Sequence, residues 1–186
     1  PKSVKNPDEL ALIWCHEAQR VFCDRLIDTD DKAMFLKLLS EVTQSELHQD
    51  IAPEVLGDTL FGDYECQDPS DRKNMYKHVT DMDNLQRLLL EYQEDYVINT
   101  MKPMDLVFFK DCIAHLSRCC RVLRQPRGCA MLVGVGGSGR SSVAKLATHM
   151  STTEDGDDYT LFTIEVGRGY GLTQFREDIK ELLFKC

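Results

Sequence analysis

Residues 128–147, GCAMLVGVGGSGRSSVAKLA, decide the fold of this chain. Their centre, GVGGSGRS at 134–141, matches the phosphate-binding pattern of Gly, four residues, Gly, Lys and Ser or Thr, except that Arg140 replaces the lysine. The apolar run at 129–133 shows no alternation, which is typical of a strand covered on both faces, and a helix is expected over 140–150. A glycine loop between a buried strand and a helix is far more specific for nucleotide binding than the glycines alone.

The residue types in this loop suit phosphate binding. Glycines accept backbone torsions that residues with a Cβ resist, so successive N–H groups can turn inward and meet an anion at the helix N-terminus. Arg140 is expected to reach the terminal phosphates as the cation, and the Ser141 hydroxyl is expected to bind magnesium. The glycines of the candidate site are Gly134, Gly136, Gly137 and Gly139.

Arg140 is the departure that bears on catalysis. Arginine keeps the charge and pairs phosphate oxygens in a fork, but it is larger and planar, whereas lysine acts as a compact point charge. Hydrolysis also requires an acidic pair at the end of a later strand. No apolar run ending in such a pair follows the loop, since Glu165 falls inside an expected strand and residues 177–178 open an expected helix. We therefore expect nucleotide binding with weak or absent hydrolysis, and we assign no catalytic residue.

The residues after the loop continue an α/β pattern. In YTLFTIEV, at 159–166, apolar side chains alternate with polar ones, which indicates a strand exposed on one face. The turn GRGYGLT at 167–173 then leads into an amphipathic helix. The predicted fold class is therefore α/β, with a helical N-terminal half followed by the start of the parallel sheet of a P-loop NTPase.

The first 127 residues show helical periodicity. Apolar residues recur at three- and four-residue steps from Asp8 to about Leu39, interrupted by the acidic DTDD at 28–31, which supplies an N-cap for the second part. The stretch 43–71 is expected to be loop with short helical pieces, because prolines and glycines punctuate it. Further helices are expected from after Asp81 to near residue 99, and from 105 to the residues before Pro126.

Composition excludes several classes of partner. The net charge is -9 with no cluster of Lys or Arg, which disfavours nucleic acid or an anionic membrane as a partner, and no apolar run approaches the ~18 residues of a membrane span. The eight cysteines form no Cys-x-x-Cys pair, and the histidines fall at no zinc-ligand spacing. We expect free thiols, a reducing cytoplasmic environment and no zinc. Because the chain starts at Pro1, it is expected to be a piece of a longer protein.

Several stretches together resemble the dynein heavy chain in its axonemal branch. The most specific are GVGGSGR at 134–140 and LRQPRG at 123–128, followed by HEAQRVFCDRL at 16–26. The resemblance covers nearly the whole chain and implies the end of the third AAA+ module and the first half of the fourth. It implies a helical lid of the preceding module over 1–60, a helical lead-in over 61–127, and the start of the P-loop large subdomain over 128–186.

The resemblance also implies a function. In that family a motor couples ATP turnover, mainly at the first module, to sliding along microtubules, and the nucleotide site of the fourth module is regulatory. The expected ligands are ATP or ADP and magnesium. The expected partners are the rest of the heavy chain and its light and intermediate chains, with the microtubule bound only through regions outside this sequence. The expected location is the cytoplasm, in the cytoskeleton of the ciliary axoneme.

Individual positions can be carried over from the family to this sequence. Leu106, Val107 and Phe108 match the lead-in segment that lies against the adenine, although plain core packing explains them equally well. Arg20 or Arg25 falls on a lid helix that can offer an arginine to a phosphate, but an ion pair with Glu17 or Asp24 is the preferred interpretation, and His16 is expected to be packed or capping. The loop positions carried over are Gly134, Val135, Gly136, Gly137, Ser138, Gly139, Arg140, Ser141 and Ser142.

Two alternatives to a regulatory nucleotide-binding module stay open. A degenerate P-loop could act only as a structural spacer within a ring of modules, with 134–141 as a glycine-rich turn that binds nothing. A stand-alone P-loop kinase or GTPase would need an acidic magnesium ligand and a base-recognition motif such as Asn-Lys-x-Asp, and the sequence contains neither. Nucleotide affinity separates the first alternative from the regulatory module, and single-turnover hydrolysis separates the second.

Overall fold

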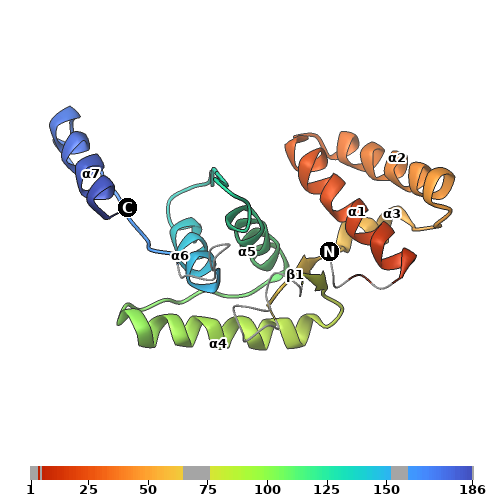
Figure 1. The fold of residues 1–186 in the computed structure, drawn as a ribbon, viewed down its shortest axis with the longest axis horizontal. Coiled ribbons are helices and arrows are strands. Elements are labelled where there is room, and N and C mark those ends of the chain that lie inside the picture. Colours follow the sequence, from red (N-terminus) through yellow and green to blue (C-terminus); the bar gives the residue numbers. More distant parts are fainter. Residues whose placement is uncertain (1–3, 5, 65–75, 152–158, 186) are drawn as a thin grey trace.

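The computed structural model describes residues 4, 6–64, 76–151 and 159–185. Figure 1 shows helices α1 to α3 grouped on one side, α4 running beneath α5 and α6, and α7 at the far end. No helix of the described residues is both long and apolar enough to cross a bilayer. In chain order the elements are α1 (Pro7–Val21), η1 (Cys23–Arg25), α2 (Thr29–Leu47), α3 (Pro53–Asp58), β1 (Phe61–Gly62), β2 (Lys77–His78), α4 (Met82–Thr100), α5 (Lys110–Leu123), α6 (Arg140–Met150) and α7 (Leu172–Lys185).

Helix α2 begins where the sequence predicts and ends later. The Asp28 carboxylate accepts the Asp30 N–H at 3.0 Å, which caps the helix as expected. The expected end near Leu39 is wrong, because the helix continues to Leu47 and stops at His48, whose φ is 56°. The extension is held by Thr43, which is fully buried on the same face as Leu39 and donates its hydroxyl to the Leu39 carbonyl at 2.7 Å.

Helices α4 and α5 confirm most of the predicted boundaries. Asp81 caps α4 by accepting the Asn84 N–H at 2.9 Å, and α4 ends at Met101, where φ is 54°. Helix α5 ends before Pro126 as predicted, but it begins at Lys110 instead of residue 105. The residues between Met101 and Lys110 form a segment without helix, which we call the lead-in segment, 102–109.

The predicted parallel sheet is not found in the described part of the chain. The sheet that is present pairs β1 with β2 in antiparallel register, Phe61 opposite His78. Residues 129–133 and 159–166 have no described strand beside them, and they are extended and mostly exposed, with Met131 88% and Val133 83% exposed. A strand needs a neighbour for its hydrogen bonds, whereas a helix bonds within itself, so only the helices of the predicted α/β unit form.

Two apolar clusters hold the helices together. The larger one lies between α4, α5 and α6, centred on Leu89, Leu116 and Leu146, each of which is at most 1% exposed. The smaller one joins α1, α2 and α3 through Cys15, Leu39 and Leu56. Residues 152–158 of the acidic stretch STTEDGDD, which begins at Ser151, and the last part of the expected loop, 65–71, lie outside the described residues.

The described cysteines are free thiols that differ in burial. Cys15, Cys23, Cys112 and Cys120 are buried, whereas Cys129, just before the glycine loop, is exposed. Burial raises the pKa of the Cys120 thiol to about 12, so this side chain stays protonated and packs as a small apolar group.

Adjacent leucines on α4 give a matched test of the larger cluster. Leu89 is 1% exposed and Leu90 is 43% exposed. Leu89→Ala should lower the free energy of unfolding by about 2–5 kcal/mol, because it removes buried methyl groups and leaves a cavity. Leu90→Ala, which makes the same chemical change at a half-exposed position, should cost under about 1 kcal/mol. Urea denaturation measures both, and equal costs would contradict the described packing of α4.

Candidate nucleotide-binding site

The glycine loop leads directly into the N-terminus of α6. The Ser138 N–H donates to the Val135 carbonyl at 3.3 Å and closes a turn. Gly137 and Gly139 both have a φ of 79°, a left-handed conformation that side chains with a Cβ resist. Gly139 is the N-cap of α6, and no side chain caps the helix there. The first N–H groups of α6 are therefore left for another acceptor, which is the usual arrangement at an anion site.

The groups around this helix end fit a phosphate. A Cβ placed on Gly136 or Gly137 would meet no atom within 4 Å, so the space above the loop is open. The Ser141 hydroxyl is exposed and Ser142 is half-buried, both in the first turn of α6. Backbone N–H groups, a guanidinium and a hydroxyl are the donor set that a phosphate oxygen accepts from, and a hydroxyl in this position can also join a magnesium ion.

Arg140 folds back onto the loop. Its Nη2 donates to the Val135 carbonyl at 3.1 Å. Its aliphatic part lies over Gly134, since a Cβ on that glycine would lie 3.4 Å from Arg140 Cδ and 2.9 Å from Ser138 Oγ. The bond to Val135 uses one of the five N–H donors of the guanidinium, so the others stay available to a phosphate.

The lead-in residues that were predicted as a group have different surroundings. The Leu106 side chain lies against the loop, with its Cδ2 3.6 Å from the position of a Cβ on Gly139. The Val107 side chain is 76% exposed, and Phe108 is 4% exposed within the larger apolar cluster. The structure thus brings Leu106 to the phosphate loop and Phe108 to the core, and contact with adenine stays a prediction for all three.

Comparison with known proteins gives the family. Residues 104–186 match the family model described as P-loop containing dynein motor region D4. The chain is 37% identical over 186 residues to Dynein axonemal heavy chain 3 of Homo sapiens, with 93% of this chain and 4% of that protein covered. It is 36% identical over 184 residues to Dynein-1-alpha heavy chain, flagellar inner arm I1 complex, of Chlamydomonas reinhardtii, with 96% and 4% covered. The chain belongs to the dynein heavy-chain family.

This dynein chain spans about 4% of the length of the curated relatives that it matches. A further relative, Dynein axonemal heavy chain 1 of Mus musculus, is 38% identical over 190 residues that include 100% of this chain. The names of these relatives are axonemal or flagellar. A P-loop holds nucleotide phosphates, so the family match implies nucleotide binding in general at the glycine loop.

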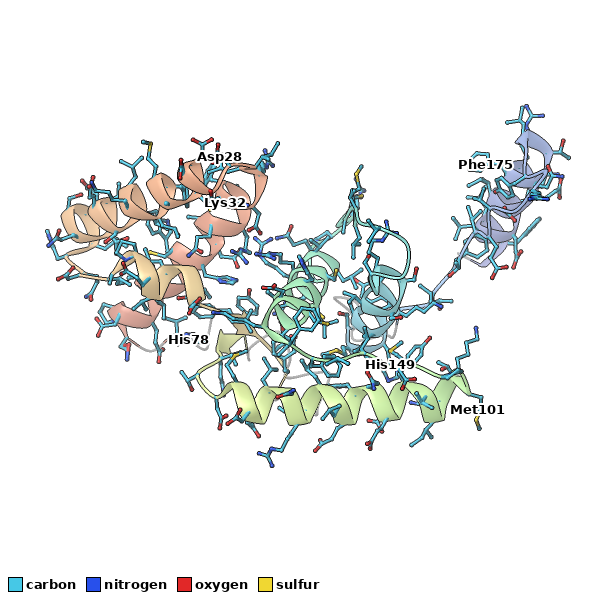
Figure 2. All side chains as sticks on the ribbon, turned by 180° about the vertical axis from the view of Figure 1, so that it is seen from behind. Asp28, Lys32, His78, Met101, His149 and Phe175 are labelled. Atoms are coloured by element: carbon cyan, nitrogen blue, oxygen red, sulfur yellow. The ribbon has the colours of Figure 1, made fainter. Side chains whose placement is uncertain are left out.

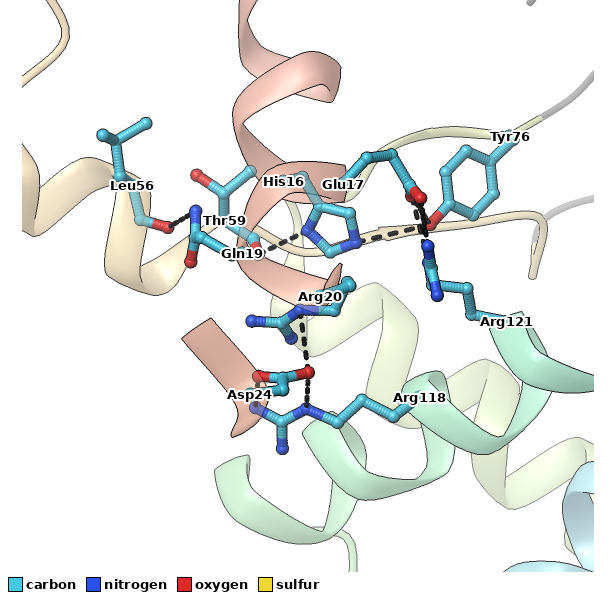
Figure 3. Close-up of polar contacts among 10 residues, drawn as sticks. All are labelled: His16, Glu17, Gln19, Arg20, Asp24, Leu56, Thr59, Tyr76, Arg118 and Arg121. Atoms are coloured by element: carbon cyan, nitrogen blue, oxygen red, sulfur yellow. Dashed lines mark hydrogen bonds and ion pairs between the residues drawn. The ribbon is translucent and has the colours of Figure 1, made fainter. Parts of the chain in front are cut away.

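In this dynein chain α1 and the short helix η1 carry a partly buried polar cluster, drawn in Figure 3. Arg20 pairs with Asp24, whose Oδ2 lies 3.2 Å from Arg20 Nε, and this confirms the predicted ion pair. His16 is 3% exposed, which confirms a packed histidine. Its Nδ1 lies 3.2 Å from the Thr59 carbonyl, and because a carbonyl only accepts, Nδ1 carries the proton. Its Nε2 lies 3.3 Å from the Tyr76 hydroxyl.

Arginines on α5 are the residues that sequence reasoning missed. Arg121 Nε donates to both carboxylate oxygens of Glu17 on α1, at 3.2 and 3.0 Å. Arg118 Nε lies 3.2 Å from Asp24 Oδ2, and Arg124 pairs with Asp63 and also lies 4.8 Å above the Tyr76 ring. The spacing of three residues along α5 is visible in the sequence, but the acidic partners are distant in the chain and nothing local identifies them.

The cluster changes the protonation of its members. Burial would raise the pKa of Glu17, but the hydrogen bonds and the charge of Arg121 act in the opposite direction and lower it overall, so Glu17 stays ionised. Burial, together with the nearby Arg20, lowers the pKa of His16 to about 4, so the imidazole is neutral. The cluster therefore joins α1 to α5 by charge without burying an unpaired ion.

The neutral His16 predicts a pH dependence of stability. The pKa of an unfolded histidine is about 6.5, and the folded value of about 4 lies below it. Between these values the unfolded chain binds a proton that the folded chain does not, so stability is complete above pH 6.5 and falls as the pH drops to 4, by up to about 3 kcal/mol. Unfolding at a series of pH values should show a shallower loss for His16→Asn, and identical slopes would contradict the assignment.

A double-mutant cycle tests the link between α1 and α5. Glu17→Gln and Arg121→Gln should show a coupling energy of about 1 kcal/mol, allowing for solvent screening at a partly exposed pair. The control pair is Asp58 and Lys110, which also joins the two parts of the chain but has side chains 70% and 71% exposed. Its coupling should be near zero. A larger coupling for the exposed pair would argue against the described geometry.

Proposed function

We propose that the glycine loop binds ATP or ADP with magnesium and acts as a regulatory site of a dynein motor, with weak or absent hydrolysis. The observation that carries the proposal is the approach to α6, where Gly137 and Gly139 adopt a φ of 79° and the helix starts without a side-chain cap. Free N–H groups, Arg140 and the exposed Ser141 meet at this point. Arg140 would bind the terminal phosphates, and the Ser141 hydroxyl would bind the magnesium ion.

The chemistry of Arg140 supports binding over turnover. A planar guanidinium holds two phosphate oxygens in a fixed fork, but it follows a migrating phosphoryl group less readily than a compact ammonium does. The Nη2 of Arg140 also bonds the Val135 carbonyl, which restrains the guanidinium at the loop. The acidic residues that follow the loop offer little help, since Glu165 lies on an exposed extended segment and Asp178 lies on α7, which Figure 1 shows away from α6.

The proposal extends to the protein that carries this segment. The relatives are named as axonemal and flagellar heavy chains. We therefore propose a motor that couples ATP turnover at another module to sliding along microtubules in the axoneme. Its partners would be the rest of the heavy chain and the light and intermediate chains, and it would contact the microtubule through regions outside this sequence.

A second candidate function is a structural spacer between neighbouring modules. The hydrogen bond from Arg140 to the Val135 carbonyl favours it, because it gives the guanidinium a partner within the loop itself. On this alternative the glycines serve only to make the turn into α6. Nucleotide affinity separates the two functions, because a spacer has no need of the free N–H groups of the helix.

Arg140→Ala tests the proposed site. Loss of a charged hydrogen-bonding group at the phosphate should weaken binding of a fluorescent ADP or ATP analogue, with magnesium, by about 10- to 100-fold. Arg168→Ala is the matched control, since it removes the same charge from an exposed position after the second extended segment and should leave affinity within about twofold. Fluorescence titration of residues 1–186 gives both values, with circular dichroism to show that each variant is folded.

Two results would contradict the proposal. A folded wild-type chain that binds neither nucleotide would leave residues 134–141 as a structural turn. Rapid release of inorganic phosphate in a single-turnover measurement would contradict a regulatory site with weak hydrolysis. Binding that weakens in Arg140→Ala but not in Arg168→Ala, with slow or no hydrolysis, is the result that we expect.

A further inference from the structure

The lead-in segment runs back along the helix that precedes it. Helix α4 ends at Met101, labelled at the end of this helix in Figure 2, and the chain reverses there because Met101 takes a left-handed conformation. Figure 1 shows the segment returning beside α4 before it enters α5. The segment has no strand beside it in the described residues, and apart from the bond of the Phe109 N–H to the Val107 carbonyl at 3.1 Å its backbone groups need partners outside the segment.

Two glutamines of α4 supply partners for two of these backbone groups. The Gln93 Oε1 accepts the Leu106 N–H at 3.1 Å, and the Gln86 Nε2 donates to the Phe108 carbonyl at 3.1 Å. They are seven residues apart, which is about two helical turns, so both stand on one face of α4. One binds as an acceptor and the other as a donor, and together they pair two of the backbone groups that a neighbouring strand would otherwise pair.

The residue that Gln93 holds also touches the phosphate loop. Leu106 lies against Gly139, the N-cap of α6, with Leu106 Cδ2 3.6 Å from the position of a Cβ on that glycine. The other end of the lead-in is fixed differently, because the Phe108 side chain is buried in the larger apolar cluster. Leu106 is only partly buried and packs against the outside of the same cluster, so its place beside the loop depends on that packing and on the bond to Gln93 together.

We infer that Gln93 is a positioning residue of the nucleotide site. By holding the Leu106 N–H, its amide oxygen keeps the lead-in segment against the loop, at the side where the nucleoside part of a bound nucleotide would lie. Gln93 itself touches no phosphate and acts through Leu106. This inference rests on the proposed function, which assigns the loop to the phosphates, and on the expectation stated above that residues 106–108 lie against the adenine.

The separation of roles makes the inference testable with two probes. ADP uses both the loop and the lead-in, whereas inorganic tripolyphosphate uses the loop alone. In the complete chain Gln93→Leu, which keeps size but removes the acceptor, should weaken ADP about three- to tenfold and leave tripolyphosphate unchanged. Gln93→Glu keeps an acceptor oxygen at the same place and should restore most of the ADP affinity. Calorimetric titration with magnesium measures the affinity of each protein for each probe.

The outcomes distinguish this inference from the proposed function. Unchanged ADP affinity in Gln93→Leu, while the wild type binds ADP, would overturn the inference alone. Equal weakening of ADP and tripolyphosphate would also overturn it, because it would show a general structural role. A folded wild type that binds neither probe would overturn the proposed function and this inference with it. If Gln93→Leu fails to fold, Leu106→Ala keeps the hydrogen bond, removes the contact with Gly139 and is expected to give the same selective loss.

Discussion

Helix α5 presents an apolar face on one side and arginines on another, and neighbouring helices pack against these two surfaces. Its apolar face, with Ile113 and Leu116, packs against α4 and α6 and excludes water. Arg118 and Arg121 instead pair with carboxylates of the first helices. Apolar burial is not directional, whereas the hydrogen bonds between a guanidinium and a carboxylate fix the relative orientation of the helices that carry them. The core therefore holds α5 in place, and the arginines set how the N-terminal helices lie against it.

The outcome for secondary structure follows from where hydrogen bonds are made. Helices α4, α5 and α6 could be predicted because caps, apolar periodicity and a following proline all act within a few residues. The run at 129–133 has the composition of a buried strand, yet it is mostly exposed. An apolar composition favours a covered position, but the covering strand has to come from another part of the chain. Helix α2 continues past its predicted end because the burial of Thr43 outweighs the weak helix propensity of threonine.

In the candidate site, too, features set by neighbouring residues could be predicted from the sequence and contacts between distant residues could not. The phosphate loop is a contiguous sequence, so its glycines, Arg140 and Ser141 could be named from the sequence, and so could the local pair of Arg20 and Asp24. The hydrogen bond between Gln93 and Leu106 could not be predicted, since the sequence does not indicate which group a glutamine on an amphipathic helix will bond. The bond from Arg140 to its own loop was equally hidden, because it depends on a side-chain torsion and not on residue type.

The uneven burial of the thiols has a practical consequence for labelling. Cys15, Cys112 and Cys120 are enclosed, and burial raises their pKa values, so little reactive thiolate forms. Cys129 is the exposed thiol of the described residues, a few positions ahead of Gly134. A maleimide dye attached there would sit at the entrance to the glycine loop. The chain thus carries a native attachment point for an optical reporter of loop movement.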